Sequence, residues 1–291
     1  MATLKQLRQR IRAAKSIQQI TRAMKLVAAA RLKKATDRAL QARPYSEKLR
    51  DVMLSISESG ELPAHPLLEK RVGDNYCLLL ITGERGLCGS YNTNVIRKAA
   101  DFLASTPGNP TIFAVGKKGM QFFSKRGYKI AHHYTLPSAG VSYDDALKVA
   151  RIARELFETN QVQRLYLCYS QFYSPIRQVP RVIQLLPIEP PVADTGPETA
   201  APHAELSFSF EPKATSLLEE LLPRYFLTLV HQGLLEGTAS FFGAQMTAMT
   251  NATDNAGKMI SDLTLKANRE RQTAITTEIL EVVGGAEALK G

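Results

Sequence analysis

The sequence predicts an α/β protein in which a Rossmann-like α/β domain accompanies a long antiparallel coiled coil of the N- and C-terminal helices. Two observations concern the ends of the chain: Arg224–Val283 contains no proline, and residues 2–58 show a second long helical pattern. A third is that strand-like and helix-like segments alternate in the middle. We therefore expect an N-terminal helix over residues 1–60, a globular domain over 74–210 and a C-terminal helix over 211–285.

The C-terminal helix is too long for a compact domain. At the α-helical rise, Arg224–Val283 would extend about 90 Å, and a helix longer than about 25 residues is typical of a coiled coil. Its glycines each cost about 1 kcal/mol relative to alanine, so the helix needs a packing partner. We expect Pro223 to bend the chain where this helix takes over, and Gly284-Gly285 to end it. The expected seam consists of Phe242, Met249, Ala252, Ala256, Met259 and Leu263.

The N-terminal helix has apolar residues that form two seams. The first is Leu4, Leu7, Ile11 and Ala14, and the second is Ile17, Ile20, Met24 and Val27. Consecutive steps of three join them, and such a slip locally overwinds a coiled coil. Pro44 is expected to kink or break this helix. Two such helices from one chain, running antiparallel, would supply each other's missing apolar partner.

The positive charge of the chain is concentrated at its start. The chain carries a net charge of +10, and residues 1–50 hold 14 Lys/Arg against only Asp37 and Glu47. The remainder is close to neutral, so the excess indicates an acidic partner for the N-terminal helix. Nucleic acid is one such partner, but the first 44 residues contain no aromatic side chain, and the basic residues flank a coiled-coil seam.

The middle of the chain alternates between strands and helices, which predicts a largely parallel sheet. Residues 187–204 contain five prolines and are expected to form an exposed loop. The expected strands are residues 76–82, 111–115, 129–134 (at an edge), 164–170, 179–186 and 205–210, and the expected helices are residues 92–104, 117–125 and 142–159.

No convincing active site stands out in the sequence. Gly83–Gly89 lies where a phosphate-binding loop would lie, between a strand and a helix, but its spacing does not fit GxGxxG and it lacks the Lys-Ser/Thr ending of a P-loop. A structural turn is therefore the favoured interpretation, with a nucleotide-binding enzyme as the alternative. His132 and His133 alternate on a strand and cannot easily share a metal. We expect no catalytic residue, no metal and no cofactor. The three cysteines are expected to be small buried residues: Cys77, Cys88 and Cys168.

Several motifs in order resemble the gamma subunit of F-type ATP synthase over the full chain. The C-terminal helix carries Ile275-Thr276-Thr277-Glu278, then Glu281 and Gly285-Ala286, after Ala248-Met249 and Ala252-Thr253-Asp254-Asn255. The N-terminal helix carries Ile20–Ala28, and the middle domain carries Arg85–Gly89 and Gln178-Val179-Pro180.

The resemblance implies a mechanical role without bond chemistry in this chain. The two terminal helices would form the central-stalk rotor inside a ring of alpha and beta subunits, with the epsilon subunit and the c-subunit ring near the α/β domain. Proton flow would turn the c ring and this shaft, which drives the beta sites through their states. No nucleic acid and no membrane-spanning segment is expected.

The resemblance also implies which residues meet the beta subunit. Met24 and Lys25 would lie at the acidic lever loops of beta, and Arg271, Gln272, Thr276 and Glu278 near another beta loop. From the residues alone, Met24 is equally a seam residue, and Arg271 and Glu278 are equally a solvated face.

Two departures qualify the resemblance. Gln245 stands where some members carry arginine, and the cysteine-bearing regulatory insertion of plant-type members is absent between Tyr173 and Pro187 and elsewhere. The second departure predicts no thiol control. No clear presequence is present, although a transit peptide is a weak alternative for the first residues. We expect a peripheral position on the cytoplasmic side of a bacterial inner membrane, or at a thylakoid membrane in a cyanobacterium.

Overall fold

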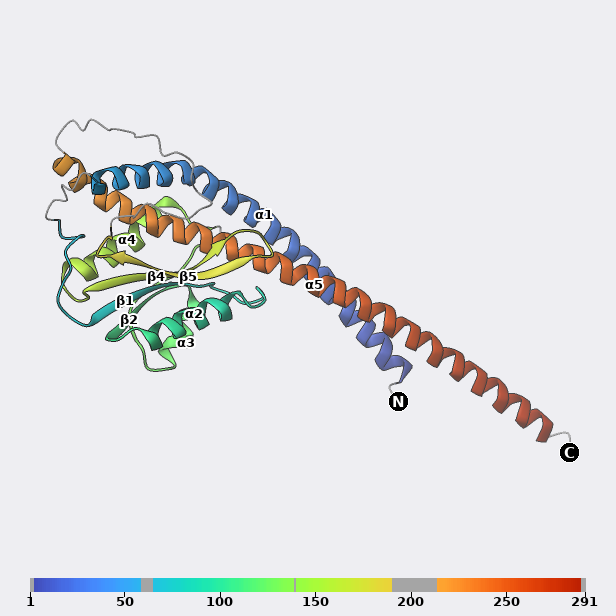
Figure 1. Cartoon of the computed structure of the whole chain (residues 1–291). Coiled ribbons are helices and arrows are strands. Elements are labelled where there is room, and N and C mark those ends of the chain that lie inside the picture. Colours follow the sequence, from blue (N-terminus) through green and yellow to red (C-terminus); the bar gives the residue numbers. More distant parts are fainter. Residues whose placement is uncertain (1–2, 59–64, 139, 190–213, 289–291) are drawn as a thin grey trace. The chain divides into compact units, whose positions relative to one another are not determined.

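The structure is a computed structural model that describes residues 3–58, 65–138, 140–189 and 214–288. Two compact units can be distinguished. Unit 1 combines Met1–Ala28 with Met246–Gly291, and unit 2 is Ala29–Gln245. The two long helices α1 (Leu4–Glu58) and α5 (Ala214–Ala288) each contribute to both units (Figure 1).

Unit 2 is built on a five-stranded sheet with the order β3-β2-β1-β4-β5. The first four strands in this order are parallel, and β5 is antiparallel to β4. The expectation of a largely parallel sheet is therefore confirmed, and the 129–134 strand lies at an edge as expected. The strands are β1 (Asn75–Ile81), β2 (Asn109–Val115), β3 (Lys129–Tyr134), β4 (Arg164–Phe172) and β5 (Gln178–Leu186).

Helices cover both faces of this sheet, which is why its central strands are continuous apolar runs. In β1, Tyr76 to Ile81 are all buried. The helices α2 (Tyr91–Ser105) and α3 (Lys117–Ser124) pack on one face. The opposite face is covered by α4 (Tyr143–Glu158) and by the unit 2 segments of α1 and α5. A capping box between Ser142 and Asp145 begins α4.

Glycines on α5 allow it to lie against the sheet. A Cβ at Gly233 would come within 2.7 Å of Leu167 Cδ2, and one at Gly237 within 2.9 Å of Ile81 Cγ2. The hydroxyl of Tyr91 donates a 2.9 Å hydrogen bond to the Gly237 carbonyl. The helical cost of these glycines is thus offset by close packing between helix and sheet.

The Gly83–Gly89 segment is a structural turn. The Gly83 amide donates to Asn92 Oδ1 at 2.8 Å, and a Cβ at Gly83 would collide with the Phe241 ring. Asn92 also donates to the carbonyl oxygen of Arg85. Since the Gly83 amide is already used and covered, it is not available to a phosphate oxygen.

The terminal helices cover nearly the predicted segments, and neither is broken by its proline. α1 continues through Pro44, and α5 continues through Pro223. The expected stop at Gly284-Gly285 is wrong, because α5 extends to Ala288. Glycine lowers helix stability but does not by itself force the left-handed conformation of a C-cap. The expected 205–210 strand and most of the proline-rich loop lie outside the described residues.

A partner-contact surface on the two-helix coil

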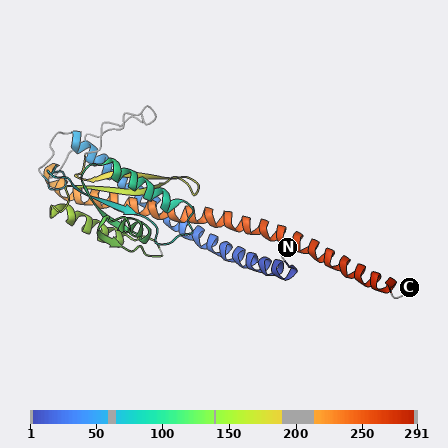
Figure 2. The same ribbon diagram turned by 90° about the horizontal axis from the view of Figure 1, so that it is seen from below.

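The two helices of unit 1 run antiparallel. Thr253 Oγ1 donates to Thr21 Oγ1 at 2.8 Å, and Gln18 Nε2 lies 3.1 Å from where a Cβ on Gly257 would be. The later residue on α5, Gly257, therefore faces the earlier residue on α1, Gln18, as expected for antiparallel helices. Figure 2 shows these segments side by side, with α5 continuing past the start of α1. The antiparallel coil of the predicted fold class is confirmed within this unit.

The α1 side of the seam is an uninterrupted heptad of one leucine followed by three small residues. Leu7, Ala14, Thr21 and Ala28 are buried at steps of seven, and Gln18 lies between two of them half-buried. The expected three-residue slip is wrong: Ile17 is 54% exposed and Ile20 56% exposed. Val27 is also outside the seam. A regular heptad keeps one face toward the partner, and in this coil that requirement outweighs the hydrophobicity of single residues.

The α5 side follows the same rule. Met249, Ala256 and Ala267 are buried, whereas Met259 is 56% exposed, so its expected place in the seam is wrong. The half-buried neighbour Ile260 lies one step along the helix and occupies the seam instead. The expected seam positions Met249 and Ala256 are confirmed by their burial.

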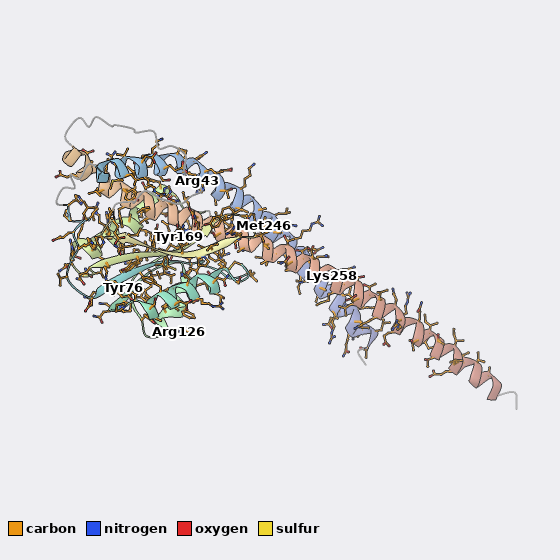
Figure 3. The ribbon with its side chains drawn as sticks, viewed as in Figure 1. Arg43, Tyr76, Arg126, Tyr169, Met246 and Lys258 are labelled. Carbon is orange, nitrogen blue, oxygen red and sulfur yellow. The ribbon has the colours of Figure 1, made fainter. Side chains whose placement is uncertain are left out.

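Large apolar side chains are left on the outside of the paired coil. We call this set the outer apolar residues: Ile17, Ile20, Leu26, Val27, Met259 and Leu265. Around them, the α1 segment carries exposed cations at Arg8, Arg12, Lys15 and Arg22, and Lys258 projects from α5 (Figure 3). A surface that combines apolar and cationic side chains fits a partner with apolar and acidic groups.

Beyond the start of α1, the C-terminal end of α5 has no helical partner among the described residues. We call residues 271–286 the unpaired end, and every one of them is exposed. It carries the apolar side chains Ile275, Ile279, Leu280, Val282 and Val283. A solitary amphipathic helix of this kind is marginal in water, so this end is suited to being surrounded by another protein.

The residues expected to contact the beta subunit fall into two separate groups. Met24 and Lys25 are half-buried on the paired coil, with Lys25 at a position of the heptad seam. The other group is exposed on α5: Arg271, Gln272, Thr276 and Glu278. Because the two helices are antiparallel, Arg271 lies level with the start of α1 and not with Met24. Each group must therefore meet a different part of any partner.

The details of these side chains limit what they can do. Thr276 Oγ1 donates to the Gln272 carbonyl at 2.9 Å, so the hydroxyl proton of Thr276 is used within the helix.

Across the described ranges, no group of three or more His, Cys, Asp or Glu side chains could hold a metal ion. Within those same ranges, no helix is both long enough and apolar enough to cross a membrane. The three cysteines are buried free thiols, as expected.

The sequence reasoning missed the outer apolar residues. It assigned Ile17, Ile20 and Val27 to the seam because they are the most apolar residues at helical spacing. The signal that could have identified them was the unbroken seven-residue step from Leu7 to Ala28, which requires no slip.

Comparison with known proteins assigns the family. A family model described as ATP synthase matches residues 3–289. The ATP synthase gamma chain of Pelotomaculum thermopropionicum is 42% identical over 290 residues and covers 100% of both chains. The ATP synthase gamma chain of Brevibacillus brevis is 42% identical over 288 residues and covers 98% of both. A chain of the Euglena gracilis mitochondrial ATP synthase shares the fold, with a TM-score of 0.67, 18% identity, and coverage of 98% of this chain and 94% of that one. The chain belongs to the ATP synthase gamma-chain family.

Proposed function

We propose that this chain is the central-stalk rotor subunit of a proton-translocating ATP synthase, and that it transmits rotation of a c-subunit ring to catalytic sites on beta subunits. The supporting observation is the two-helix coil of unit 1, which buries small residues and exposes large apolar ones. Partner proteins that surround this coil would bury its exposed apolar side chains. Like its family, the chain is a non-catalytic subunit.

The proposed partners follow from the family and from the printed descriptions of related assemblies. One structural neighbour is described as part of an assembly of OSCP, F1 and c-ring, and another as part of a central stalk and c-ring. We assign alpha and beta subunits to the coil, and the epsilon subunit and c-ring to unit 2. As a peripheral subunit of such a complex, the chain would lie on the cytoplasmic side of a bacterial inner membrane or at a thylakoid membrane.

Within this function, we assign the six predicted residues to beta contacts in two zones. Met24 and Lys25 form a zone on the paired coil, where a half-buried cation beside an apolar side chain suits an acidic loop. Arg271, Gln272, Thr276 and Glu278 form a zone at the unpaired end, where exposed side chains of both signs suit a polar loop.

Co-purification tests the assembly. The full chain, co-expressed with alpha and beta subunits of a bacterial ATP synthase, should be recovered in a complex with both. A chain that stays monomeric in their presence would rule out the rotor role. A matched variant with Ile275 and Ile279 changed to serine should be recovered less efficiently, since it removes apolar side chains from the unpaired end without touching a seam.

Met24→Lys tests the first contact zone. The added charge lies beside Lys25, so we expect the ratio of ATP-driven proton pumping to ATP hydrolysis to fall roughly two-fold or more, with assembly retained. Met24→Leu keeps an apolar side chain of similar size and should behave as the unmodified chain. Unchanged pumping in Met24→Lys would remove Met24 from the contact.

A further inference from the structure

A second concentration of positive charge lies in unit 2, on the side of the sheet that α3 covers. Residues 102–143 contain five Lys or Arg residues and no Asp or Glu. Four of the five are exposed and Lys118 is half-buried. Figure 3 shows Arg126 on the opposite side of the sheet from Arg43 of α1. We call the five residues the α3 cations, because they lie on α3, in the turn after it and at the start of the edge strand β3: Lys117, Lys118, Lys125, Arg126 and Lys129.

The α3 cations are not balanced by carboxylates of the same chain. Among the residues that the structure describes, none of the five lies within 4.0 Å of an acidic oxygen. The other surface helices of unit 2 do carry such pairs: Lys148 Nζ lies 2.6 Å from Asp144 Oδ2 on α4, and Arg224 Nη2 lies 3.6 Å from Glu220 Oε2 on α5. The α3 side therefore has a local excess of positive charge, although the chain after residue 50 is close to neutral as a whole.

The lysines at the start of α3 do not serve the helix. α4 begins with the acids Asp144 and Asp145, which suit the positive end of a helix dipole, whereas the first turn of α3 has no acid and begins with Lys117 and Lys118. The backbone fixes the start of α3, because the Lys118 amide donates to the Gly83 carbonyl and the Gly119 amide donates to Thr82 Oγ1. The lysine charges thus add repulsion to the folded chain, and an anion from outside would relieve it.

At the other end of α3, the Arg126 side chain is held in a fixed position. Its guanidinium carbon lies 3.5 Å from the centroid of the Phe122 ring, and its Nη1 donates to the Phe122 carbonyl at 3.3 Å. The Phe122 ring in turn packs against the fully buried Phe123, with 5.0 Å between the ring centroids. Arginine has five N–H donors, so this guanidinium can still donate to a carboxylate with little loss of side-chain freedom.

The spacing of the α3 cations matches acidic side chains on a helix. Lys118 and Lys125 are seven residues apart, which places them on one side of α3 and about 10.5 Å apart along its axis. Carboxylates seven residues apart on a partner helix have the same separation. Phosphates repeat every 3.4 Å or so along a nucleic-acid strand, which is much closer. Among the described residues 91–138, no large apolar side chain is exposed that could enter a lipid surface.

We propose that the α3 cations form a docking surface for an acidic helix of a partner protein, with two groups of carboxylates two turns apart. One group would contact Lys117 and Lys118, and the other would contact Lys125, Arg126 and Lys129. Between the two groups, the partner helix would lie over Gln121. The surface belongs entirely to unit 2, so the proposal does not depend on the rotor function.

The probe is an alanine-rich helical peptide with two Glu-Glu pairs that begin seven residues apart, and its control has the same composition with the four glutamates contiguous. Fluorescence anisotropy with the full chain should show that the probe binds about five-fold more tightly than the control peptide. Lys117→Gln combined with Lys125→Gln should weaken binding of the probe about five-fold, because each change removes one ion pair at an exposed position.

Arg8→Gln combined with Arg12→Gln is the matched control variant, since it removes the same charge from exposed positions of α1. It should change binding of the probe by less than about two-fold. Equal losses in the two variants, or equal binding of the two peptides, would show attraction to net charge alone and would overturn the proposal.

Zero-length carbodiimide cross-linking, which joins a lysine amine to a glutamate carboxyl, locates the bound probe independently of affinity. Peptide mapping by mass spectrometry should find the cross-links at the lysines of the α3 cations. Cross-links mainly at Lys5, Lys15 or Lys25 would refute the docking surface. Phosphatidylglycerol vesicles and duplex DNA test the other polyanions. If either loses more affinity than the peptide in the Lys117→Gln, Lys125→Gln variant, the surface serves a membrane or a nucleic acid and the proposed acidic helix is wrong.

Discussion

The sheet domain of unit 2 and the paired coil of unit 1 use side-chain size in opposite ways. The sheet domain encloses large residues such as Phe113, Phe123 and Phe157, none of which has exposed surface. The paired coil buries Ala14, Thr21 and Ala256, and leaves isoleucine, leucine and methionine outside. Because the hydrophobic contribution scales with buried apolar area, we expect the sheet domain to contribute more to the stability of the chain than the coil. In this chain, buried apolar side chains are large in one unit, and exposed apolar side chains are large in the other.

The largest effect expected from this contrast is in the sheet domain. Phe157→Ala should lower the free energy of unfolding by about 3–5 kcal/mol, because it leaves a cavity between α4 and the sheet. Chemical denaturation followed by circular dichroism measures it. Leu265→Ala, at an exposed position of α5, is the control and should change stability by less than about 0.5 kcal/mol. Similar losses in both variants would contradict the contrast.

Glu236→Gln should stabilise the chain in a pH-dependent way. Burial raises the pKa of Glu236 above that of an ordinary carboxyl, although Gln232, the Phe172 amide and two arginines oppose the shift. The folded state therefore binds the proton more tightly than the unfolded state, and stability falls as pH rises from the ordinary carboxyl pKa through the folded one.

The variant removes this loss. It should be more stable than the unmodified chain by on the order of 1 kcal/mol at pH 7, and equal to it in acid below the ordinary carboxyl pKa. Thermal unfolding across this pH window measures the difference. A constant difference at all pH values would show that the charge of Glu236 is not its cause.

A smaller effect is expected within the seam of the coil. Thr253→Val removes the donor to Thr21 and should speed local amide exchange in unit 1 by a factor that corresponds to about 0.5–1.5 kcal/mol. Thr253 Oγ1 also lies 2.8 Å from the Met249 carbonyl oxygen four residues earlier. Thr264→Val is the matched control, because Thr264 donates to the carbonyl of Ile260 in the same way but is exposed and makes no interhelical bond among the described residues. Equal effects would mean that the interhelical bond contributes nothing.

The smallest effect on stability is expected at the outer apolar residues. Ile20→Ser should change the unfolding free energy of the isolated chain by less than about 0.5 kcal/mol, because Ile20 is more than half exposed. The same change should reduce recovery with alpha and beta subunits in the co-purification. Loss of stability without loss of recovery would place Ile20 in a core.

The sequence was sufficient to predict the sheet and insufficient to predict the seam. Buried strands such as Tyr76–Ile81 are continuous apolar runs, and the same run that predicts the strand is buried in the structure. In the coil, the apolar residues Ile17 and Ile20 and the polar Thr21 compete for one face, and only the position of the partner helix decides among them. The helix end at Gly284-Gly285 failed for a related reason, because glycine is permissive and does not require a stop.

The candidate site was predicted only in part. The resemblance supplied the six contact residues, and their exposure or half-burial is compatible with contact but does not identify a partner.

The small residues of the seam have a consequence for the girth of the coil. Alanine, threonine and glycine at facing positions allow two helix backbones to approach to the short end of the usual interaxial range, about 8 Å. A coil this narrow can turn inside a narrow channel. A bulkier residue at Ala14 or Ala256 would widen the coil at the level of that residue. In the proposed rotor, such a wider level would bring the coil closer to the subunits around it.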